Sequence, residues 1–304
     1  MPLPARSGQT QSFLIRRFRE VGIHPDTRHG QNFLIDLNLL RVLVDAARLD
    51  PNDVVLEIGT GTGSLTALLA PYVAEVVTVE VDSQLHQLAS EELIDFENVT
   101  LLQQDALHNK NTMQPAVLEI VREKLAVAPE RRLKLVANLP FNVATPILSN
   151  LLACDTVPAS MTVTIQKELA DRIMARPSTK DYSALSIWIQ SQCDVELVRL
   201  LPPTVFWPRP KVNSAIIHVT LQRDLRAAIP DRKFFHEFTR SMFFHRRKFL
   251  RSELVSAYKD RLTKTDADQI ITALGLPATA RAEELDVAAM LRLCESVRAR
   301  LSDR

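Results

Sequence analysis

Short apolar runs recur along the first two thirds of the chain, and each ends at a polar residue or a glycine-rich turn. Stretches with helical spacing separate them. This alternation predicts a largely parallel, buried β-sheet whose strands are joined by helices. The runs with the strand pattern are 54–58, 76–80, 99–102, 133–137, 161–165, 195–200 and 214–219. We therefore expect an α/β sheet of about seven strands with helices on both faces, closed by the run at 214–219.

The pattern changes at about residue 223. From there on it is helical without a strand signal, which indicates a second, smaller domain. We expect three parts: a basic N-terminal segment at 1–23, an α/β domain at 24–222 and a small all-α domain at 223–304. A chain of 304 residues, 46% of them apolar, can bury two hydrophobic cores.

A glycine-rich turn follows the first strand run. Gly59, Gly61 and Gly63 lie within five positions, in a chain that has seven glycines. Without a Cβ, such a turn lets a ligand lie against the main chain, beside the free N–H groups of the next helix. The dinucleotide motif does not match because Ser64 and Thr66 stand where its third glycine belongs, and no phosphate loop follows. The spacing Glu-x-Gly-x-Gly-x-Gly resembles the first motif of S-adenosylmethionine (SAM) methyltransferases. A tight strand-to-helix junction without a ligand is the alternative.

Acidic residues end the next two strand runs. Glu80 stands 21 residues after Gly59, where a carboxylate can accept hydrogen bonds from two ribose hydroxyls. Asp105 follows the third run and can accept a hydrogen bond from an adenine amino group, because the tips of neighbouring parallel strands lie side by side. An acid facing water and a turn-forming aspartate are the alternatives.

The fourth run ends at Asn138-Leu139-Pro140-Phe141. Proline stops the strand and turns the asparagine side chain outward. An amino nitrogen on an aromatic base is a poor nucleophile because its lone pair is delocalised into the ring. The Asn138 oxygen and a neighbouring carbonyl can accept its N–H bonds and aim the lone pair at a methyl group, while Phe141 stacks on the base. A capping asparagine and a core phenylalanine are the alternative.

A proline-rich stretch runs from Pro202 to Val212. We expect a stiff loop that cannot join a sheet. A stiff loop can hold one of its aromatic residues in place as the second wall of a pocket for a flipped base. A crossover with a buried aromatic is the alternative.

In chain order, these motifs resemble the ribosomal RNA adenine N6-dimethyltransferase family over about residues 21–285. The resemblance rests on Gln31-Asn32-Phe33-Leu34, the glycine turn, Glu80, Asp105, Asn138 to Phe141, Gln166-Lys167-Glu168 and the later proline-rich and arginine-rich stretches. It implies a SAM-dependent methyltransferase with a Rossmann-like sheet, whose cofactor contacts Asn32, Leu34, Gly59, Gly61, Glu80, Asp105 and Asn138. It also implies that the target base faces Asn138, Leu139, Pro140 and Phe141, with Phe206 as the second aromatic wall and Trp207 as a less favoured match.

Three positions depart from the family pattern. Phe141 replaces the tyrosine that is usual in the bacterial branch, which keeps the stacking face and removes a hydroxyl. Thr60 replaces the usual proline of the glycine turn, and Arg209 interrupts the usual proline triplet and adds a cation for a phosphate. None of these changes removes a group on which methyl transfer depends.

Basic residues are concentrated at two places, although the net charge is only +1. Residues 1–30 hold five arginines against two acids, and residues 223–264 hold twelve lysines and arginines against five acids. A basic helical face contacts phosphates without reading sequence. A merely solvated face is the alternative. We expect RNA contacts at Arg209, Lys211, Arg246, Arg247, Lys248 and Arg251.

The cysteines Cys154, Cys193 and Cys294 are scattered, without a histidine at metal spacing, which indicates a reduced protein without a structural metal. No apolar run reaches the roughly 18 residues of a membrane span, and the start lacks a signal-peptide core. An organellar transit peptide is the less favoured alternative for the arginine-rich start. We expect a cytoplasmic monomer that binds neither membrane nor metal.

The family resemblance also implies a reaction and a partner. Its bacterial branch methylates two adjacent adenosines in the 3′-terminal hairpin of small-subunit (16S) rRNA, so we expect N6-dimethylation of that RNA during small-subunit biogenesis. One alternative is the large-subunit adenine methyltransferase of macrolide resistance, which shares the stretch Phe-x-Pro-x-Pro-Lys-Val. Another is a ribosome assembly factor that binds RNA and SAM without turnover. Gln31 to Asp36 and Arg246 to Arg251 favour the small-subunit enzyme, and intact Asn138 and Phe141 argue against a non-catalytic factor.

Overall fold

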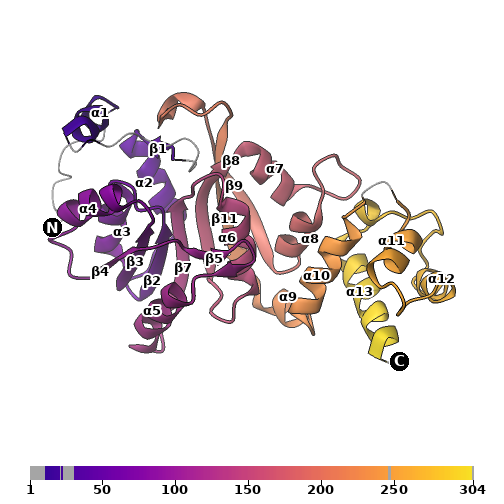
Figure 1. The fold of residues 1–304 in the computed structure, drawn as a ribbon. Coiled ribbons are helices and arrows are strands. Elements are labelled where there is room, and N and C mark those ends of the chain that lie inside the picture. The colour runs from indigo at the N-terminus through magenta and orange to yellow at the C-terminus, as the bar shows by residue number, and fades with distance from the viewer. Residues whose placement is uncertain (1–10, 21, 23–30, 246–247, 303–304) are drawn as a thin grey trace. The chain divides into compact units, whose positions relative to one another are not determined.

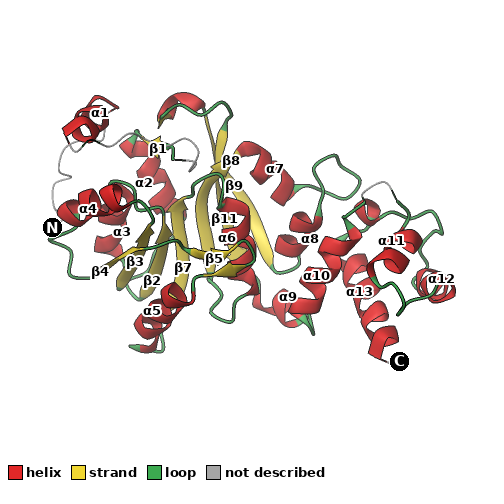
Figure 2. Cartoon of the chain, in the orientation of Figure 1, coloured by secondary structure: helices red, strands yellow, loops and turns green. Residues whose placement is uncertain are grey.

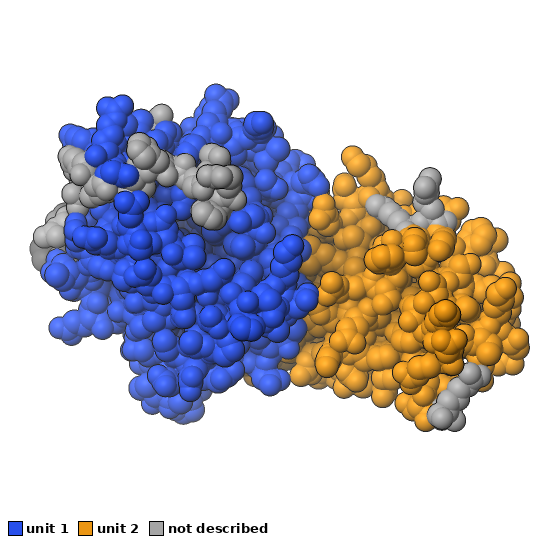
Figure 3. Space-filling model, in the orientation of Figure 1, with its two compact units in different colours: residues 1–170, 196–220 blue, residues 171–195, 221–304 orange. Residues whose placement is uncertain are grey.

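A computed structural model describes residues 11–20, 22, 31–245 and 248–302 of the chain (Figure 1). The chain divides into two compact units (Figure 3): unit 1 comprises residues 1–170 and 196–220, and unit 2 comprises residues 171–195 and 221–304. The stretch 171–195, which the sequence analysis placed in the domain at 24–222, thus belongs to the same unit as the C-terminal helices.

A seven-stranded sheet has the strand order β4-β3-β2-β7-β8-β11-β9 (Figure 2). Its strands are β2 (Asp53–Ile58), β3 (Glu75–Glu80), β4 (Val99–Gln103), β7 (Arg132–Asn138), β8 (Ser160–Gln166), β9 (Cys193–Leu201) and β11 (Ser214–Leu221). The strands from β4 to β8 pair in parallel, and β11 pairs antiparallel with β8. The predicted seven-stranded α/β sheet is therefore confirmed.

The strand β11 is not at the edge of this sheet. It lies between β8 and β9, so the expectation that the run at 214–219 closes the sheet is wrong. The reason is burial: the first six residues of β11 are all buried, whereas exposed positions recur along β9. A strand buried on both faces needs a neighbour on each side, while a partly polar strand tolerates the edge.

Helices follow most of the strands and connect each of these to the next strand. They are α2 (Leu37–Ala46), α3 (Ser64–Leu69), α4 (Ser83–Glu92), α5 (Pro115–Ala126), α6 (Ala144–Ala153) and α7 (Lys167–Met174), with a 3₁₀ turn η2 at Ala70–Tyr72 and a small hairpin of β5 (Leu107–Asn109) and β6 (Thr112–Met113). Asp36 and Asp82 cap α2 and α4 through their side-chain oxygens. A shared core that includes Leu43, Leu69 and Val136 packs α2 and α3 on the sheet. This packing fixes the turns at the carboxyl ends of the strands.

A ribbon of two short strands, each two residues long, lies beside these turns. The strand β1 (Phe33–Leu34) pairs antiparallel with β10 (Phe206–Trp207), which follows a 3₁₀ turn η3 at Pro203–Val205. The expectation that the proline-rich stretch cannot join a sheet is wrong, because Phe206 and Trp207 stand between prolines and keep their own N–H groups. The helix α1 (Gln11–Glu20) packs on the ribbon through Phe18, whose ring centroid lies 5.2 Å from that of Phe33 and 5.4 Å from that of Trp207.

Unit 2 is helical. It contains α8 (Ala184–Gln190), α9 (Arg223–Ala227), α10 (Arg232–Met242), α11 (Leu250–Ala257), α12 (Lys264–Ala273), a 3₁₀ turn η4 (Ala282–Glu284) and α13 (Val287–Ser302). The buried Trp188 of α8 packs against Phe235 of α10, with ring centroids 6.3 Å apart. The Tyr182 hydroxyl donates to the Leu285 carbonyl at 2.9 Å, so the stretch before α8 is tied to the C-terminal part of the unit.

Candidate active site

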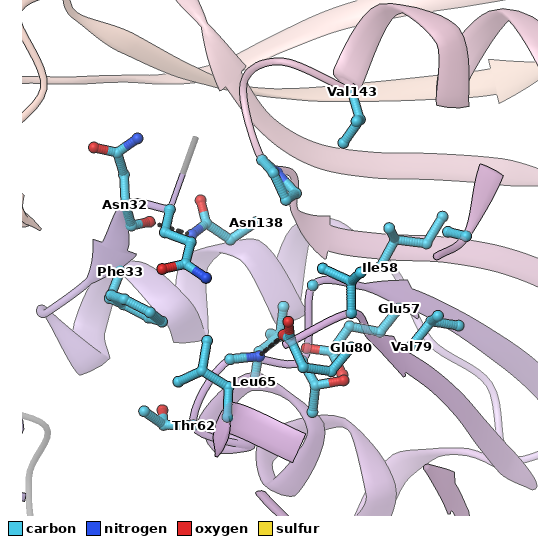
Figure 4. Close-up of a pocket in the computed structure, with 18 of the residues that line it drawn as sticks. Asn32, Phe33, Glu57, Ile58, Thr62, Leu65, Val79, Glu80, Asn138 and Val143 are labelled. Carbon is cyan, nitrogen blue, oxygen red and sulfur yellow. Dashed lines mark hydrogen bonds between the residues drawn. The ribbon is translucent and has the colours of Figure 1, made fainter. Parts of the chain in front are cut away.

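A cavity of about 250 Å³ lies in unit 1 at the carboxyl ends of β2, β3, β4 and β7, beside β1. Figure 4 shows side chains from these separate segments converging on it. Its lining includes every residue that the sequence analysis assigned to the cofactor: Asn32, Leu34, Gly59, Gly61, Glu80, Asp105 and Asn138. The parallel sheet and the neighbouring strand β1 bring them together, and the role of each stays a prediction.

The glycine turn needs its glycines for two reasons. Gly59, Gly61 and Gly63 have φ angles of 85°, 59° and 83°, in the left-handed region that side chains disfavour. A Cβ on Gly59 would lie 3.2 Å from the Pro140 ring, and one on Gly61 would lie 3.2 Å from the Phe33 ring. The turn is therefore in close contact with both the Asn138–Phe141 segment and β1.

Glu80 ends β3 as a buried carboxylate in the cavity wall. Its Oε2 accepts a hydrogen bond from the Gly61 N–H at 2.9 Å (Figure 4), and its Oε1 accepts one from the Asp82 N–H at 3.0 Å. Burial raises the pKa of Glu80, and these backbone N–H groups oppose that rise. Each oxygen keeps acceptor capacity for a further donor, such as a hydroxyl of a ligand.

Glu57 also lines the cavity, and the sequence analysis gave it no role beyond its place in the motif. It is fully buried, and its Oε2 accepts hydrogen bonds from the Thr66 hydroxyl at 2.5 Å and the Thr78 hydroxyl at 2.7 Å. Burial raises the pKa of Glu57 to about 8. The signal in the sequence was a lone acid inside an otherwise apolar run, 54–58.

Asp105 lies at the tip of β4 and is exposed. Its Oδ1 accepts a hydrogen bond from the Leu107 N–H at 2.8 Å. It is thus part of a turn, as the alternative interpretation held, and it also lines the cavity. One carboxylate oxygen anchors the turn, and the second is available to a donor on a ligand.

The two ends of the Asn138 amide have different surroundings. Its Nδ2 donates a hydrogen bond to the Asn32 carbonyl at 2.9 Å, which joins β7 to the start of β1 (Figure 4). Its Oδ1 is buried and has no hydrogen-bond partner within the described part of the chain. Buried carbonyl oxygens are normally paired, so this oxygen is an acceptor that awaits a donor.

The residues after Asn138 are placed differently from one another. Leu139 is buried, and its N–H donates to the Thr164 carbonyl at 3.2 Å, whereas Pro140 lines the cavity. Phe141 is half-buried, with its ring centroid 6.5 Å from that of Phe206 at an interplanar angle of 69°. Phe206 itself is 2% exposed, within the core under α2. The two aromatic residues are in edge contact, and the role of Phe206 as a second wall for the base stays a prediction.

The predicted RNA contacts lie on both units. Arg209 and Lys211 are exposed on the unit 1 loop after β10, and Lys248 and Arg251 are exposed in unit 2. The Arg251 guanidinium forms an ion pair with Asp268 at 2.8 Å. Arg246 and Arg247 lie outside the described residues.

The described residues show neither a metal cluster nor a membrane-spanning helix. They contain no group of three or more His, Cys, Asp or Glu side chains that could hold a metal ion. They also contain no helix that is long and apolar enough to cross a bilayer.

Known proteins resemble the chain over most of its length. The family described as "Ribosomal RNA adenine dimethylase" matches residues 24–298. "Ribosomal RNA small subunit methyltransferase A" of Listeria innocua is 42% identical over 268 residues, which cover 87% of this chain and 88% of that protein. The protein of the same name from Geobacillus thermodenitrificans is 36% identical over 294 residues, which cover 96% of both.

Two solved structures share the fold. A dimethyladenosine transferase from Plasmodium falciparum has a TM-score of 0.70 at 22% identity, over 87% of this chain and 97% of that one. The 23S rRNA methyltransferase ErmE has a TM-score of 0.60 at 22% identity, over 88% of this chain and 99% of that one. These likenesses confirm the predicted methyltransferase fold with a helical C-terminal part. On the family match and the identity to its members, the chain belongs to the ribosomal RNA adenine dimethylase family.

Proposed function

We propose that this protein transfers methyl groups from SAM to N6 of two adjacent adenosines in the 3′-terminal hairpin of small-subunit rRNA. Membership of the family and the names of its relatives support this substrate. The observation that carries the proposal is the buried, unpaired Oδ1 of Asn138 in the wall of the same cavity as Glu80. An amino group of the substrate is the donor that this oxygen lacks.

The cavity residues fit SAM. The Glu80 carboxylate would accept hydrogen bonds from the ribose hydroxyls, and Asp105 would accept one from the adenine amino group. The glycine turn, with Asn32 and Leu34 opposite, would hold the methionine part against the main chain. When bound there, SAM supplies a methyl group on a positively charged sulfur.

The residues after β7 would present the target nitrogen. Asn138 Oδ1 accepts one N–H of the adenine amino group and a backbone carbonyl accepts the other, which draws the nitrogen lone pair out of conjugation with the ring. Phe141 stacks on the base and holds it in line with the methyl group. The methylated nitrogen is strongly acidic and loses its proton to water, so no side chain needs to act as a base.

The relatives favour the small-subunit substrate. Those at 36% to 42% identity carry the small-subunit name, whereas the large-subunit enzyme ErmE is similar in fold at 22% identity. A non-catalytic assembly factor would not need the unpaired Asn138 oxygen. We further propose a monomer that acts in the cytoplasm, where ribosomal subunits are assembled.

The test is to incubate the protein and labelled SAM with unmethylated small subunits and, in a separate reaction, with unmethylated large subunits. The modified bases are then mapped in each. We expect N6,N6-dimethyladenosine at two adjacent positions of the small-subunit rRNA. Label in an adenosine of the large subunit would replace the proposed substrate with the large-subunit one. SAM binding without label in either subunit would instead favour the assembly factor.

A further inference from the structure

Phe244 of unit 2 projects into solvent. Its side chain is 80% exposed, the largest exposed fraction among the large apolar residues in the described part of the chain. The neighbouring Phe243 faces inward, with its ring edge on that of Tyr182 at a centroid distance of 6.1 Å. Phe243 therefore packs within unit 2, whereas the Phe244 side chain lies outside its hydrophobic core.

The turn that carries Phe244 is held in place. The Phe244 N–H donates to the Ser241 carbonyl at 3.2 Å, which closes the end of α10. The His245 ring lies 4.8 Å from the Phe244 ring at 82°, and its Nδ1 is 3.3 Å from Oε1 of the buried Glu253. These contacts place Phe244 directly after the end of α10, beside the His245 side chain.

A lysine and a second exposed aromatic follow within five residues, and Arg281 lies beside that aromatic. Lys248 is exposed, and its N–H donates to the His245 carbonyl at 2.9 Å. Phe249 is 42% exposed, and the Arg281 guanidinium lies 5.6 Å from the centre of its ring. Flat rings and guanidinium planes among cations form the surface on which unpaired RNA bases stack while their phosphates are neutralised. An apolar protein partner would not require these charges.

We propose that Phe244 is a stacking platform for an unpaired base of the RNA substrate, with Lys248 contacting the adjoining phosphates. The proposal rests on the proposed function, because it takes ribosomal RNA as the ligand. It adds a contact with a base to the phosphate contacts expected of this region. It requires RNA with an unpaired nucleotide, since a base inside a duplex offers no free face.

Replacing Phe244 with Leu and with Tyr separates stacking from apolar bulk. We expect Phe244→Leu to weaken binding to unmethylated small subunits about ten-fold, and Phe244→Tyr to bind within about two-fold of the wild type, since one base–aromatic stack has that order of strength. Leu225→Ala, at another exposed apolar residue of unit 2, is the matched control and should change nothing. Both sites are exposed, so the unfolding temperatures of the three variants should match that of the wild type.

The salt dependence of RNA affinity distinguishes the contribution of the Phe244 ring from that of the Lys248 charge. Lys248→Gln should reduce the slope of log affinity against log salt by about 1, whereas Phe244→Leu should lower the affinity and leave that slope unchanged. Equal affinities for Phe244→Leu and the wild type would overturn the proposal, as would a Phe244→Tyr variant as weak as Phe244→Leu.

A photoreactive azidophenylalanine at position 244 identifies the partner. Crosslinking to an unpaired rRNA base supports the proposal, and crosslinking to a ribosomal protein overturns it. Methylation by the wild type is measured on the same particles. If the wild type methylates them and Phe244→Leu binds normally, only the stacking proposal fails. If the wild type neither binds nor methylates them, the proposed function itself fails.

Discussion

The side-chain amide of Asn138 lies in the cavity wall, where it can bind the amino group of a target base. Asn138 has its nitrogen held by the Asn32 carbonyl and its oxygen buried without a partner. The first contact fixes which way the amide faces, and the second leaves a carbonyl that gains a hydrogen bond only when a donor enters. Alanine at this position removes the acceptor and the hydrogen bond to Asn32, while Glu80, Asp105 and the glycine turn stay in place.

We therefore expect Asn138→Ala to lower the single-turnover rate of methyl transfer by about a hundred-fold or more, which is the order of effect of removing one transition-state hydrogen bond. SAM binding, followed by calorimetry, should weaken far less, because the groups assigned to the ribose and the adenine of SAM are untouched. Equal losses of binding and of rate would show that Asn138 serves the cofactor and not the target base.

Glu57 gives a pH dependence of stability. Its pKa is raised by burial to about 8 in the folded chain, from an ordinary value of 4.5. Between these values the folded state keeps a proton that the unfolded state has lost, so this group's contribution to stability falls as pH rises from 4.5 to 8, by up to about 1.4 kcal/mol per pH unit. Denaturant unfolding of the wild type and Glu57→Gln across this range should show a shallower decline in the variant. Parallel curves would contradict a protonated Glu57.

Among the elements, the sheet and the ribbon differ in how far the sequence predicts them. Apolar runs that end at Gly59, Glu80 and Asn138 imply strand tips at one edge, because parallel strands put their carboxyl ends together. The pairing of Phe33–Leu34 with Phe206–Trp207 has no such signal. Each partner is two residues long and the two lie far apart in the chain, so no periodicity reveals the ribbon. The burial of Phe206 follows from it and was missed for the same reason.

We expect the helix α1 to stabilise the ribbon of β1 and β10. Phe18 contacts the rings of both Phe33 and Trp207, and Phe33 lies over Gly61 in the cavity wall. Phe18→Ala removes the ring that joins the three elements, and a large-to-small change of this kind costs about 3–5 kcal/mol of local packing. SAM affinity should fall, and amide exchange at residues 31–34 should accelerate. Ser12→Ala, at an exposed position of the same helix, should leave both unchanged.

At the scale of the whole molecule, the boundary between the two units differs from the one that the sequence predicts. The change of pattern at residue 223 predicts an independent domain at 24–222, but unit 2 also includes the stretch 171–195. A short helix such as α8 has the same local pattern whether it packs on a sheet or on other helices, so the sequence alone does not show this. The contacts do: Trp188 stacks on His236 at a centroid distance of 4.4 Å, and the Ser178 N–H donates to the Glu283 carbonyl at 2.7 Å.

A fragment ending at residue 222 would lose both of these partners, together with Phe235 and the Leu285 carbonyl. Trp188, which is 1% exposed in the full chain, would then face water. Losing a buried aromatic contact costs about 3–5 kcal/mol, a large part of the roughly 5–15 kcal/mol that stabilises a domain. In a Trp207→Phe background, which leaves Trp188 as the sole tryptophan, we expect the fragment to show red-shifted emission and rapid tryptic cleavage within 171–195. If its emission and protease resistance instead match those of the full chain, 24–222 is an independent domain and the stretch needs no C-terminal partner.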